Sequence, residues 1–365
     1  MIASLIVTIA VGAVLLFLAK GYEKTMSLIS SRHQRRNSDP PRINADLPRI
    51  TVMIPTFNEA GTIARKLENL FDSDYPRDLL EIIVVDSSLD ETGVIASSYP
   101  VKVVRCDAVG KIRAINEGIK LCKTDIVVLT DCDTILDRRS ILCLVQSFST
   151  DVGAVGGIVR PKGNGEWFSS MKSSYHEWDW GLREVEGTVD TVCSLDGNLV
   201  AFRKSIINEI PGDAFADDME LTFAIRKKGY RCIISRGAVA YQMIPNGLSR
   251  DLQRMRRIIK LTILTSLRHS RMLFSTKYGW FSMITFPSRR FLNLLTPFML
   301  AYVAVFLWLY SPLLLLSGIA LAIAISILGL RKIGYYWILL LALTLAWLDI
   351  FAGNFHRGAV WQKVR

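Results

Sequence analysis

The stretch that decides the fold reads ITVMI at residues 50–54 and EIIVVD at residues 81–86, with a helical segment between them. Both short runs are rich in β-branched residues, which is typical of buried strands. The segment between them places four apolar side chains on one helical face: Ile63, Leu67, Leu70 and Phe71. A strand, a helix and a second strand in this order predict a βαβ unit with parallel strands.

The same alternation continues through the middle of the chain. Further strands are predicted at residues 101–105 and 125–130, and later apolar runs at residues 152–159, 192–202 and 232–243 favour an extension of mixed direction. The predicted fold is therefore an α/β domain with a mostly parallel sheet. Ligands are expected at the carboxyl ends of its strands.

Composition and charge narrow the class of protein. The 365-residue chain is 50% hydrophobic and has a net charge of +11, and the apolar excess lies at its two ends. The basic residues gather beside these apolar ends, so membrane lipids explain them better than nucleic acid, and we expect no nucleic-acid partner. The six cysteines form no CxxC pair, which argues against a zinc site or a disulfide framework and fits a reducing cytosol.

The apolar and polar segments divide the chain into six parts. These are an N-terminal transmembrane anchor (1–20), a basic linker (21–48), a catalytic domain (49–246), an amphipathic interfacial segment (247–290), C-terminal transmembrane helices (291–355) and a basic tail (356–365). The lysines and arginines after the anchor place the catalytic domain on the cytosolic side. The chain is therefore expected to be an integral membrane protein, in the plasma membrane if it comes from a prokaryote.

The C-terminal spans pose a topology problem. Three crossings, at residues 291–310, 312–330 and 335–351, would put the basic tail outside, which the positive-inside rule disfavours. Either one segment is re-entrant or interfacial, or residues 280–287 belong to a further hairpin.

The strongest chemical signal is Asp131-Cys132-Asp133, directly after an apolar strand. Residues i and i+2 of an extended chain point to the same side, so both carboxylates face one site. Hard divalent cations prefer carboxylate oxygens and can bridge the phosphates of a nucleotide. The alternative is a solvated acidic turn.

Other polar segments fall at the same predicted edge of the sheet: PTFNE at residues 55–59, VVDSSLD at 84–90, GK at 110–111 and RAINEG at 113–118. Each has a structural alternative when taken alone, such as a helix cap, a turn or a solvated lysine. Their common location favours one shared site.

In this order, these motifs resemble glycosyltransferase family 2 over about residues 50–257, and the flanking apolar segments resemble its membrane-bound, cellulose- and hyaluronan-synthase-like branch. The resemblance implies a GT-A (Rossmann-like) domain, a UDP- or GDP-linked sugar donor, and Mg²⁺ or Mn²⁺ as cofactor. It implies that Asp133 ligates the metal. It also implies nucleotide-sugar contacts from Thr56, Glu59, Asp86, Lys111 and Asp131.

The segment ADDMEL at residues 216–221 resembles the family's acidic pair, with Asp217 in place of glutamate. The resemblance implies that Asp218 is the general base of an inverting transfer, because a sugar hydroxyl is a poor nucleophile at neutral pH. The alternative is that both acids favour a helix N-terminus.

Two segments resemble the family's acceptor side. SLDGN at residues 194–198 implies acceptor-side roles for Gly197 and Asn198, together with Asp217. QRMRR at residues 253–257 resembles the QxxRW signature, which implies an acceptor-side Gln253 and an Arg256 that meets the diphosphate. Arg257 replaces the tryptophan, which argues against processive polymerisation. The alternative for Arg256 is contact with lipid headgroups.

Three functions are consistent with these features. The first is an inverting transferase that moves one sugar to a lipid-linked or glycan acceptor at the cytosolic membrane face. The second is a processive polysaccharide synthase that extrudes its polymer. The third, of another class, is a non-catalytic nucleotide-sugar-binding membrane protein.

Overall fold

The computed structural model describes residues 2–34, 47–107, 110–162, 167–243, 248–317 and 331–354. Its centre is an eight-stranded sheet with the order β3-β2-β1-β4-β7-β6-β8-β5. The strands are β1 (Ile50–Thr56), β2 (Leu80–Asp86), β3 (Lys102–Arg105), β4 (Ile126–Thr130), β5 (Thr134–Leu136), β6 (Val152–Lys162), β7 (Leu199–Arg203) and β8 (Arg231–Met243).

The first four strands in this order are parallel, and the rest of the sheet is mixed. β1 pairs in parallel with β2 and β4, and β2 with β3, whereas β7 runs antiparallel to β4 and β6. β8 is parallel to β6 and antiparallel to β5. The predicted α/β fold, with a mostly parallel sheet and a mixed extension, is confirmed.

Both faces of the sheet are covered, so β1 is buried along its whole length. Val52 and Ile54 join a core with α3 (Ile63–Phe71) and α6 (Ser140–Gln146) on one face. Met53, between them in the sequence, points to the other face and packs against α5 (Lys111–Leu121). A Cβ at Gly118 of α5 would lie only 1.9 Å from the Met53 sulfur, so glycine is required for this close packing.

The predicted strand at residues 192–202 is shorter than expected, because β7 begins at Leu199. The preceding residues form a bend, in which the backbone N–H and the side-chain amide of Asn198 both donate to Asp196 Oδ1, at 3.1 and 2.9 Å. This local bonding replaces the strand ladder and leaves residues 194–198 as a loop at the end of β4.

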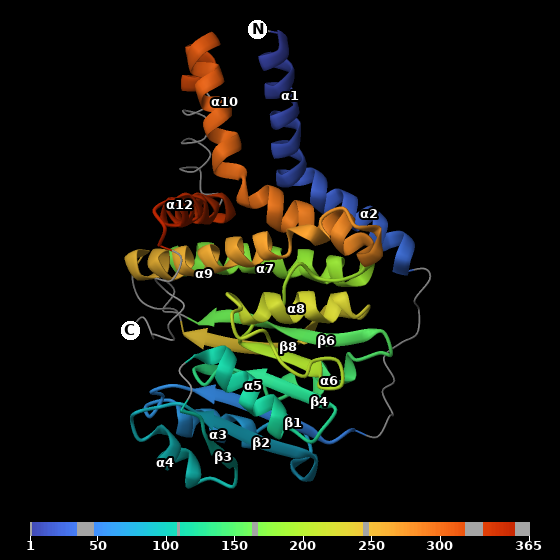
Figure 1. Cartoon of the computed structure of the whole chain (residues 1–365), viewed down its shortest axis with the longest axis vertical. Helices are drawn as coiled ribbons and strands as arrows, with labels where there is room; N and C mark the ends of the chain where they lie inside the picture. Colours follow the sequence, from blue (N-terminus) through green and yellow to red (C-terminus); the bar gives the residue numbers. More distant parts are fainter. Residues whose placement is uncertain are drawn as a thin grey trace.

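A layer of helices lies beyond the β6–β8 side of the sheet (Figure 1). It contains α7 (Trp167–Val189), α8 (Asp217–Lys227), α9 (Leu248–Arg268) and α12 (Arg331–Phe351). α2 (Tyr22–Gln34) packs on α7, so the first half of the predicted linker is a helix. Tyr22 and Met26 are buried there against Leu182 and Val189.

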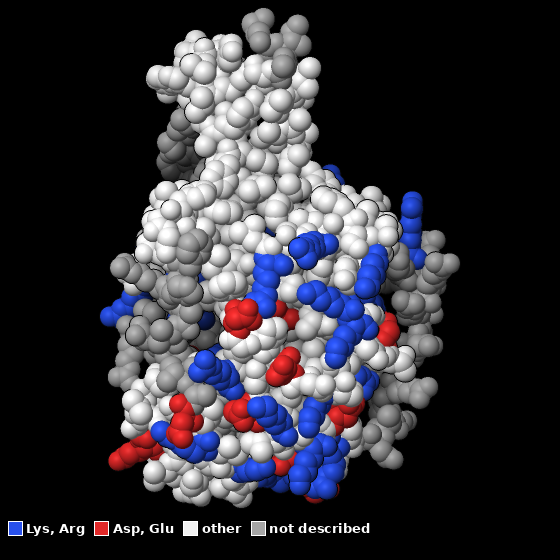
Figure 2. Space-filling model, in the orientation of Figure 1, with Lys and Arg blue, Asp and Glu red and all other residues white. Residues whose placement is uncertain are grey.

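α1 (Ile2–Leu16) and α10 (Thr296–Tyr310) project side by side from this layer (Figure 1). Their outward side chains include exposed Leu5, Ile9, Val305 and Trp308. Figure 2 shows no charged side chain on the viewed face of this projection, whereas Lys, Arg, Asp and Glu cover the body below. An exposed apolar surface of this kind is typical of contact with lipid or another apolar partner.

Several segments that the sequence predicts as membrane spans are helical in the structure, and the crossings themselves stay predictions. Among the described residues, one helix, Ser4–Arg32, is long and apolar enough to cross a bilayer. Phe281–Leu292 and Thr296–Tyr310 would add a second crossing if that pair, bent by 65°, forms one span. The expected span at 335–351 corresponds to α12, which lies across the direction of α1 and α10 and against α9 (Figure 1). Residues 318–330 and the basic tail from residue 355 lie outside the described residues.

Candidate active site

The centre of the site is an ion-pair cluster that joins three elements. Lys111, the first residue of α5, places its Nζ 2.9 Å from Asp131 Oδ1 and 3.1 Å from Asp217 Oδ2. Asp131 follows β4, and Asp217 is the first residue of α8. Burial by itself lowers the pKa of Lys111, but the two carboxylates outweigh it and raise the pKa above its ordinary value, so Lys111 is a cation.

Strand pairing places the acceptor-side loop next to this cluster. Asp131 donates its backbone N–H to the carbonyl of Asn198 at 3.4 Å, because β4 and β7 pair up to that point. A Cβ at Gly197 would lie 3.4 Å from Asp217 Oδ2 and 3.5 Å from Lys111 Nζ. The loop therefore forms a wall of the site directly beside the three charged groups.

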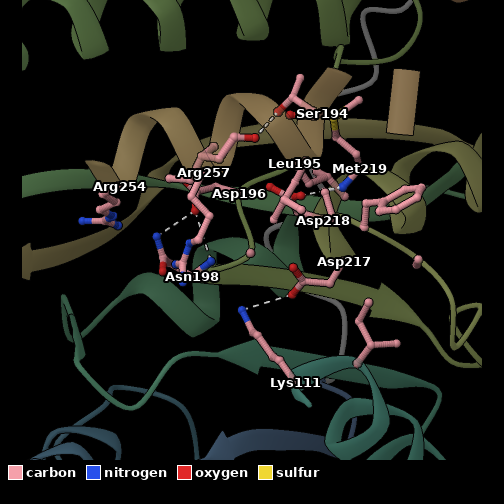
Figure 3. A pocket seen from close by; sticks show the side chains of 18 of the residues that line it. Lys111, Ser194, Leu195, Asp196, Asn198, Asp217, Asp218, Met219, Arg254 and Arg257 are labelled. Carbon is pink, nitrogen blue, oxygen red and sulfur yellow. Dashed lines mark hydrogen bonds and ion pairs between the residues drawn. The ribbon is translucent and has the colours of Figure 1, made fainter. Parts of the chain in front are cut away.

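A cavity of about 850 Å³ lies between this edge of the sheet and α9. Figure 3 shows side chains from both halves of the domain pointing into it. Five of the predicted site residues line it: Lys111, Gly197, Asn198, Asp217 and Asp218.

The carboxyl group of Asp218 has a raised pKa, which suits a general base. Burial raises its pKa, the nearby carboxylates of Asp217 and Asp196 raise it further, and the result is a pKa of about 7. Its Oδ1 accepts the backbone N–H of Met219 at 2.7 Å, which orients the carboxyl group at the start of α8. A carboxylate of this pKa can remove a proton at neutral pH.

Three of the predicted nucleotide-side residues, Thr56, Glu59 and Asp86, lie near the ends of β1 and β2. They do not line the cavity, and neither do Asp131 and Asp133. Thr56 Oγ1 donates to Asp86 Oδ1 at 3.0 Å, and the Arg105 guanidinium lies 3.3 Å from Asp86 Oδ2. Glu59 accepts a 2.6 Å hydrogen bond from Thr62. The structure thus brings Thr56 and Asp86 into contact, whereas Glu59 turns towards its own helix.

The residues around Asp133 fit a metal that shares its coordination with phosphate. Asp133 is exposed at the site's edge, and Asp131 is already bound to Lys111. No group of three or more His, Cys, Asp or Glu side chains in the described ranges could hold a metal ion by itself. Mg²⁺ and related ions are commonly held by one or two carboxylates and completed by substrate phosphates, which agrees with this donor set.

The arginine segment is oriented differently from the expectation. Arg256 was predicted to meet the diphosphate, but it forms a two-point contact with Asp349 of α12, at 2.7 and 2.5 Å, and does not line the cavity. Gln253 is exposed and does not line it either. Arg254 and Arg257 face the cavity instead (Figure 3). The cavity-facing side of α9 therefore carries Arg254 and Arg257, each one residue after a position that matches the QxxRW signature.

The structure also reveals a lysine that the sequence argument did not single out. Lys66 of α3 is fully buried behind the acidic loop, where its Nζ donates to Thr130 Oγ1 at 2.9 Å and to the Thr134 carbonyl at 2.5 Å. Its position was visible in the sequence, because Lys66 interrupts the apolar face formed by Ile63, Leu67 and Leu70.

Comparisons with known proteins identify the family of this chain. Residues 48–260, more than half of the chain, match the model of "Glycosyltransferase like family 2". A probable glycosyltransferase, YdaM, of Bacillus subtilis (strain 168) is 24% identical over 330 residues, covering 81% of this chain and 79% of that protein. Poly-β-1,6-N-acetyl-D-glucosamine synthase of Staphylococcus aureus (strain MSSA476) is 25% identical over 212 residues, covering 54% of this chain and 51% of the synthase.

Among solved structures, the mannosyltransferase PcManGT of Pyrobaculum calidifontis, in complex with GDP-Man and Mn²⁺, superimposes with a TM-score of 0.73 at 23% identity, covering 94% of this chain and 99% of that one. This likeness shows that the fold is GT-A-like. The chain belongs to glycosyltransferase family 2, whose members transfer sugars from nucleotide sugars. The predicted family and fold are confirmed.

Proposed function

We propose that this enzyme transfers one sugar, with inversion, from a UDP- or GDP-linked donor to a lipid-linked or glycan acceptor at the cytosolic face of a membrane. The observation that carries the proposal is the cluster in which Lys111 joins Asp131 to Asp217. Lys111 and Asp217 line the same cavity as Asp218. In this proposal, the residues that bind the donor and the residues that activate the acceptor therefore lie next to each other.

Asp218 accepts the proton of the acceptor hydroxyl as the oxygen attacks the anomeric carbon of the donor. The bond from that carbon to the diphosphate breaks, and a single displacement of this kind inverts the configuration. Lys111 places a fixed positive charge beside the departing diphosphate, where negative charge develops in the transition state.

A divalent cation fits the exposed carboxylate of Asp133. The mannosyltransferase of similar fold was solved with GDP-Man and Mn²⁺, which supports Mg²⁺ or Mn²⁺ here. When bound, such an ion supplies charge neutralisation for the donor's diphosphate. Asp131 and Asp133 would hold it, and Thr56, Glu59 and Asp86 would contact the base and ribose.

The membrane assignment rests on the exposed apolar projection of α1 and α10 and on the basic residues beside it. Lys20 ends the anchor and Lys24 and Arg32 follow it, so the positive-inside rule favours a cytosolic catalytic domain. A cytosolic active site has direct access to nucleotide sugars.

The test is a screen of UDP- and GDP-linked sugars for metal-dependent hydrolysis or transfer by the purified full-length chain. We expect one donor to be used in the presence of Mg²⁺ or Mn²⁺, and Asp218→Asn to abolish turnover while still binding the nucleotide. Full turnover by Asp218→Asn would remove the proposed base, and a wild-type enzyme inert towards every donor would contradict the proposal.

A processive synthase is the second candidate, favoured by the likeness to the Staphylococcus aureus poly-β-1,6-N-acetyl-D-glucosamine synthase. Arg257, which replaces the aromatic residue of the QxxRW signature, counts against it. Product size separates the two functions: labelled donor incorporated into a high-mass polymer would favour the synthase, and a single added residue would favour the transferase.

A further inference from the structure

The acceptor-side loop, residues 194–198, is attached to the helix layer through Ser194. The Arg290 guanidinium donates to the Ser194 hydroxyl at 2.5 Å, and Arg183 of α7 donates to the Ser194 carbonyl at 3.1 Å. Ser194 is only 3% exposed, so water has little access to these bonds. Two arginines from outside the sheet therefore hold the first residue of the loop.

The two arginines belong to elements that are themselves firmly connected. Arg183 Nε lies 2.8 Å from Asp179, one turn earlier on α7, and Asp179 also contacts Arg289. Arg290 lies in the helical turn Pro287–Leu292, which leads directly into α10. The attachment of the loop is thus continuous with the layer from which the apolar projection rises (Figure 1).

The next residue of the loop connects it to α8. The backbone N–H of Leu195 donates to the Thr222 hydroxyl at 3.1 Å, and this hydroxyl donates to the Asp218 backbone carbonyl at 2.8 Å. Leu195 and Thr222 are both buried, and hydrogen bonds are stronger in such an environment than in water. The loop and the first turn of α8 are therefore linked through one buried side chain.

Asp196 brings a carboxylate from the loop close to Asp218 (Figure 3). Two N–H groups of Asn198 donate to Asp196 Oδ1, so this carboxylate is fixed within the loop. Burial raises the pKa of Asp218 most, and the carboxylates of Asp217 and Asp196 raise it further. A backbone N–H and the Lys111 ammonium lower it. The distance between the loop and α8 therefore affects the ionisation of Asp218.

Asp196 is the only charged residue of the loop. The other basic side chains of the cavity wall lie outside the loop, at Arg113, Lys172, Arg183, Arg254, Arg257 and Arg290. The titratable residues Asp213 and His176 also line the wall from outside the loop. A displacement of the loop alone would therefore move a single charge relative to Asp218, that of Asp196.

We propose that the two arginines on Ser194 are positioning residues that keep the acceptor-side loop against the start of α8, a role that rests on the proposed function. Asp196 then stays beside Asp218, and Thr222 holds the backbone of the base. In this role Arg183 and Arg290 act through the loop, without contact to the reacting atoms. The seating of α10 in the helix layer is thereby coupled to the proton acceptor.

The test is a double-mutant cycle of Ser194→Ala and Asp218→Asn, measured by thermal unfolding of the full-length chain in detergent at pH 8 and pH 4. At pH 8, Asp218→Asn should raise the melting temperature, because the ionised carboxylate opposes folding. This gain should be clearly smaller in the Ser194→Ala background, because the loop has moved Asp196 away. At pH 4 the two substitutions should be additive. Arg290→Gln, which removes the other partner of the same bond, should act as Ser194→Ala does.

Three variants serve as controls. Ser194→Thr keeps the hydroxyl group and should restore the wild-type gain. Ser30→Ala removes a 2.8 Å hydroxyl contact with Thr188 between α2 and α7, so it should lower the melting temperature without changing the gain. Asp196→Asn should reduce the gain by itself, and Ser194→Ala should reduce it no further in that background.

Kinetics test the catalytic side with whichever UDP- or GDP-linked sugar the enzyme uses. Ser194→Ala should lower kcat and leave the donor KM within about twofold, because the donor-side residues keep their places. The pH below which kcat/KM falls should decrease by roughly 0.5–1 unit. A raised donor KM with unchanged kcat would contradict the proposal.

The unfolding cycle can also overturn the proposal. It would do so if folded Ser194→Ala and Arg290→Gln variants showed the full wild-type gain at pH 8, or if the wild type showed no gain there. If the wild type uses no donor, the proposed function fails, whereas the unfolding cycle still decides whether the arginines act on Asp218 through the loop.

Discussion

Asp218 combines a half-buried carboxyl group with a pKa of about 7. As the base it must be ionised, so kcat/KM should rise as the pH increases through about 7 and fall about tenfold per pH unit below it. A pH–rate profile with saturating metal measures this dependence. If kcat/KM fell only below pH 5, a group with an ordinary carboxyl pKa would limit the reaction instead.

The same pKa has a consequence for stability. The folded-state pKa of Asp218 lies above its unfolded value, so its carboxylate opposes folding above pH 7, and this penalty disappears as the pH falls below the unfolded pKa of about 4. Asp218→Asn should therefore unfold at a higher temperature than the wild type at pH 8 and at an equal temperature near pH 4. Thermal unfolding at both pH values is the measurement, and an equal shift at both would refute this linkage.

Lys66 supports the acidic loop from behind, because its ammonium bonds to Thr130 and Thr134 on either side of Asp131 and Asp133. Lys66→Met leaves the buried Thr134 carbonyl without this partner, which should cost about 1–3 kcal/mol of stability. It should also weaken activation by Mn²⁺, because the loop loses its anchor. Arg65→Met, an exposed neighbour on α3, is the control. Unchanged Mn²⁺ activation in a destabilised Lys66→Met variant would limit Lys66 to folding.

At the residue scale, the sequence predicted which side chains lie at the same edge of the sheet, but not which of them form ion pairs. Asp131 and Lys111 were expected at the site from their places after a strand and before a helical segment, whereas Asp217 was expected there only from the family resemblance. That one ammonium reaches both carboxylates depends on the β4–β7 pairing, which has no local signal in the sequence. Long-range pairing of this kind is fixed by the packing of the whole domain.

At the scale of elements, the helical periodicity of α9 was clear, but its orientation was not. An apolar stripe shows which face is buried, yet the basic residues on the remaining surface can face a cavity, another helix or lipid. Arg256 faces α12 because Asp349 offers a carboxylate in two-point geometry. A motif match alone could not reveal this, since the partner lies 93 residues away.

The Arg256–Asp349 pair should therefore hold α12 against α9 without binding the donor. Arg256→Ala and Asp349→Ala should each lower stability by about 0.5–1 kcal/mol, and the double variant by clearly less than the sum. Unfolding free energies and the KM for the donor are to be measured for all three. A raised donor KM in Arg256→Ala alone would restore the diphosphate contact implied by the QxxRW resemblance.

At the scale of the whole molecule, a buried polar network ties the N-terminal helix to the catalytic domain. Glu186 of α7 accepts hydrogen bonds from Tyr22 of α2 at 2.9 Å, from Arg289 at 2.7 Å and from the Cys193 backbone at 2.9 Å. Arg289 lies in the helical turn Pro287–Leu292 and also contacts Asp179. One carboxylate thus connects three segments that are distant in the sequence.

Glu186→Gln removes one of the two carboxylates that face buried Arg289, and Arg289 keeps Asp179 as a partner. The weakened hydrogen bonds should cost about 1–3 kcal/mol. The melting temperature of the full chain in detergent should fall accordingly, and α2 should become sensitive to protease. Glu184→Gln, two residues away in an exposed pair with Arg236, should cost less than about 1 kcal/mol. Equal effects of both substitutions would show that the network does not anchor α2.

The arrangement of the apolar segments was the least predictable feature at this scale. Length and hydropathy are similar for a helix that crosses a bilayer and one that lies along its surface, so residues 335–351 were expected to span. α12 instead buries Tyr335, Ala342 and Ala346, two of them small side chains that allow close packing with its neighbours. The direction of a helix depends on such contacts.

The Lys111 bridge has a final consequence for the order in which ligands arrive. An isolated divalent ion that approaches Asp131 meets a carboxylate whose charge is already balanced by a tethered ammonium. A donor offers its own diphosphate to that ammonium and so releases the carboxylate. We therefore expect Mn²⁺ alone to bind weakly and to bind much more tightly once GDP or UDP is present, a synergy that Lys111→Met should reduce. Calorimetric titration of Mn²⁺ with and without nucleotide would reveal whether resting enzyme excludes stray metal.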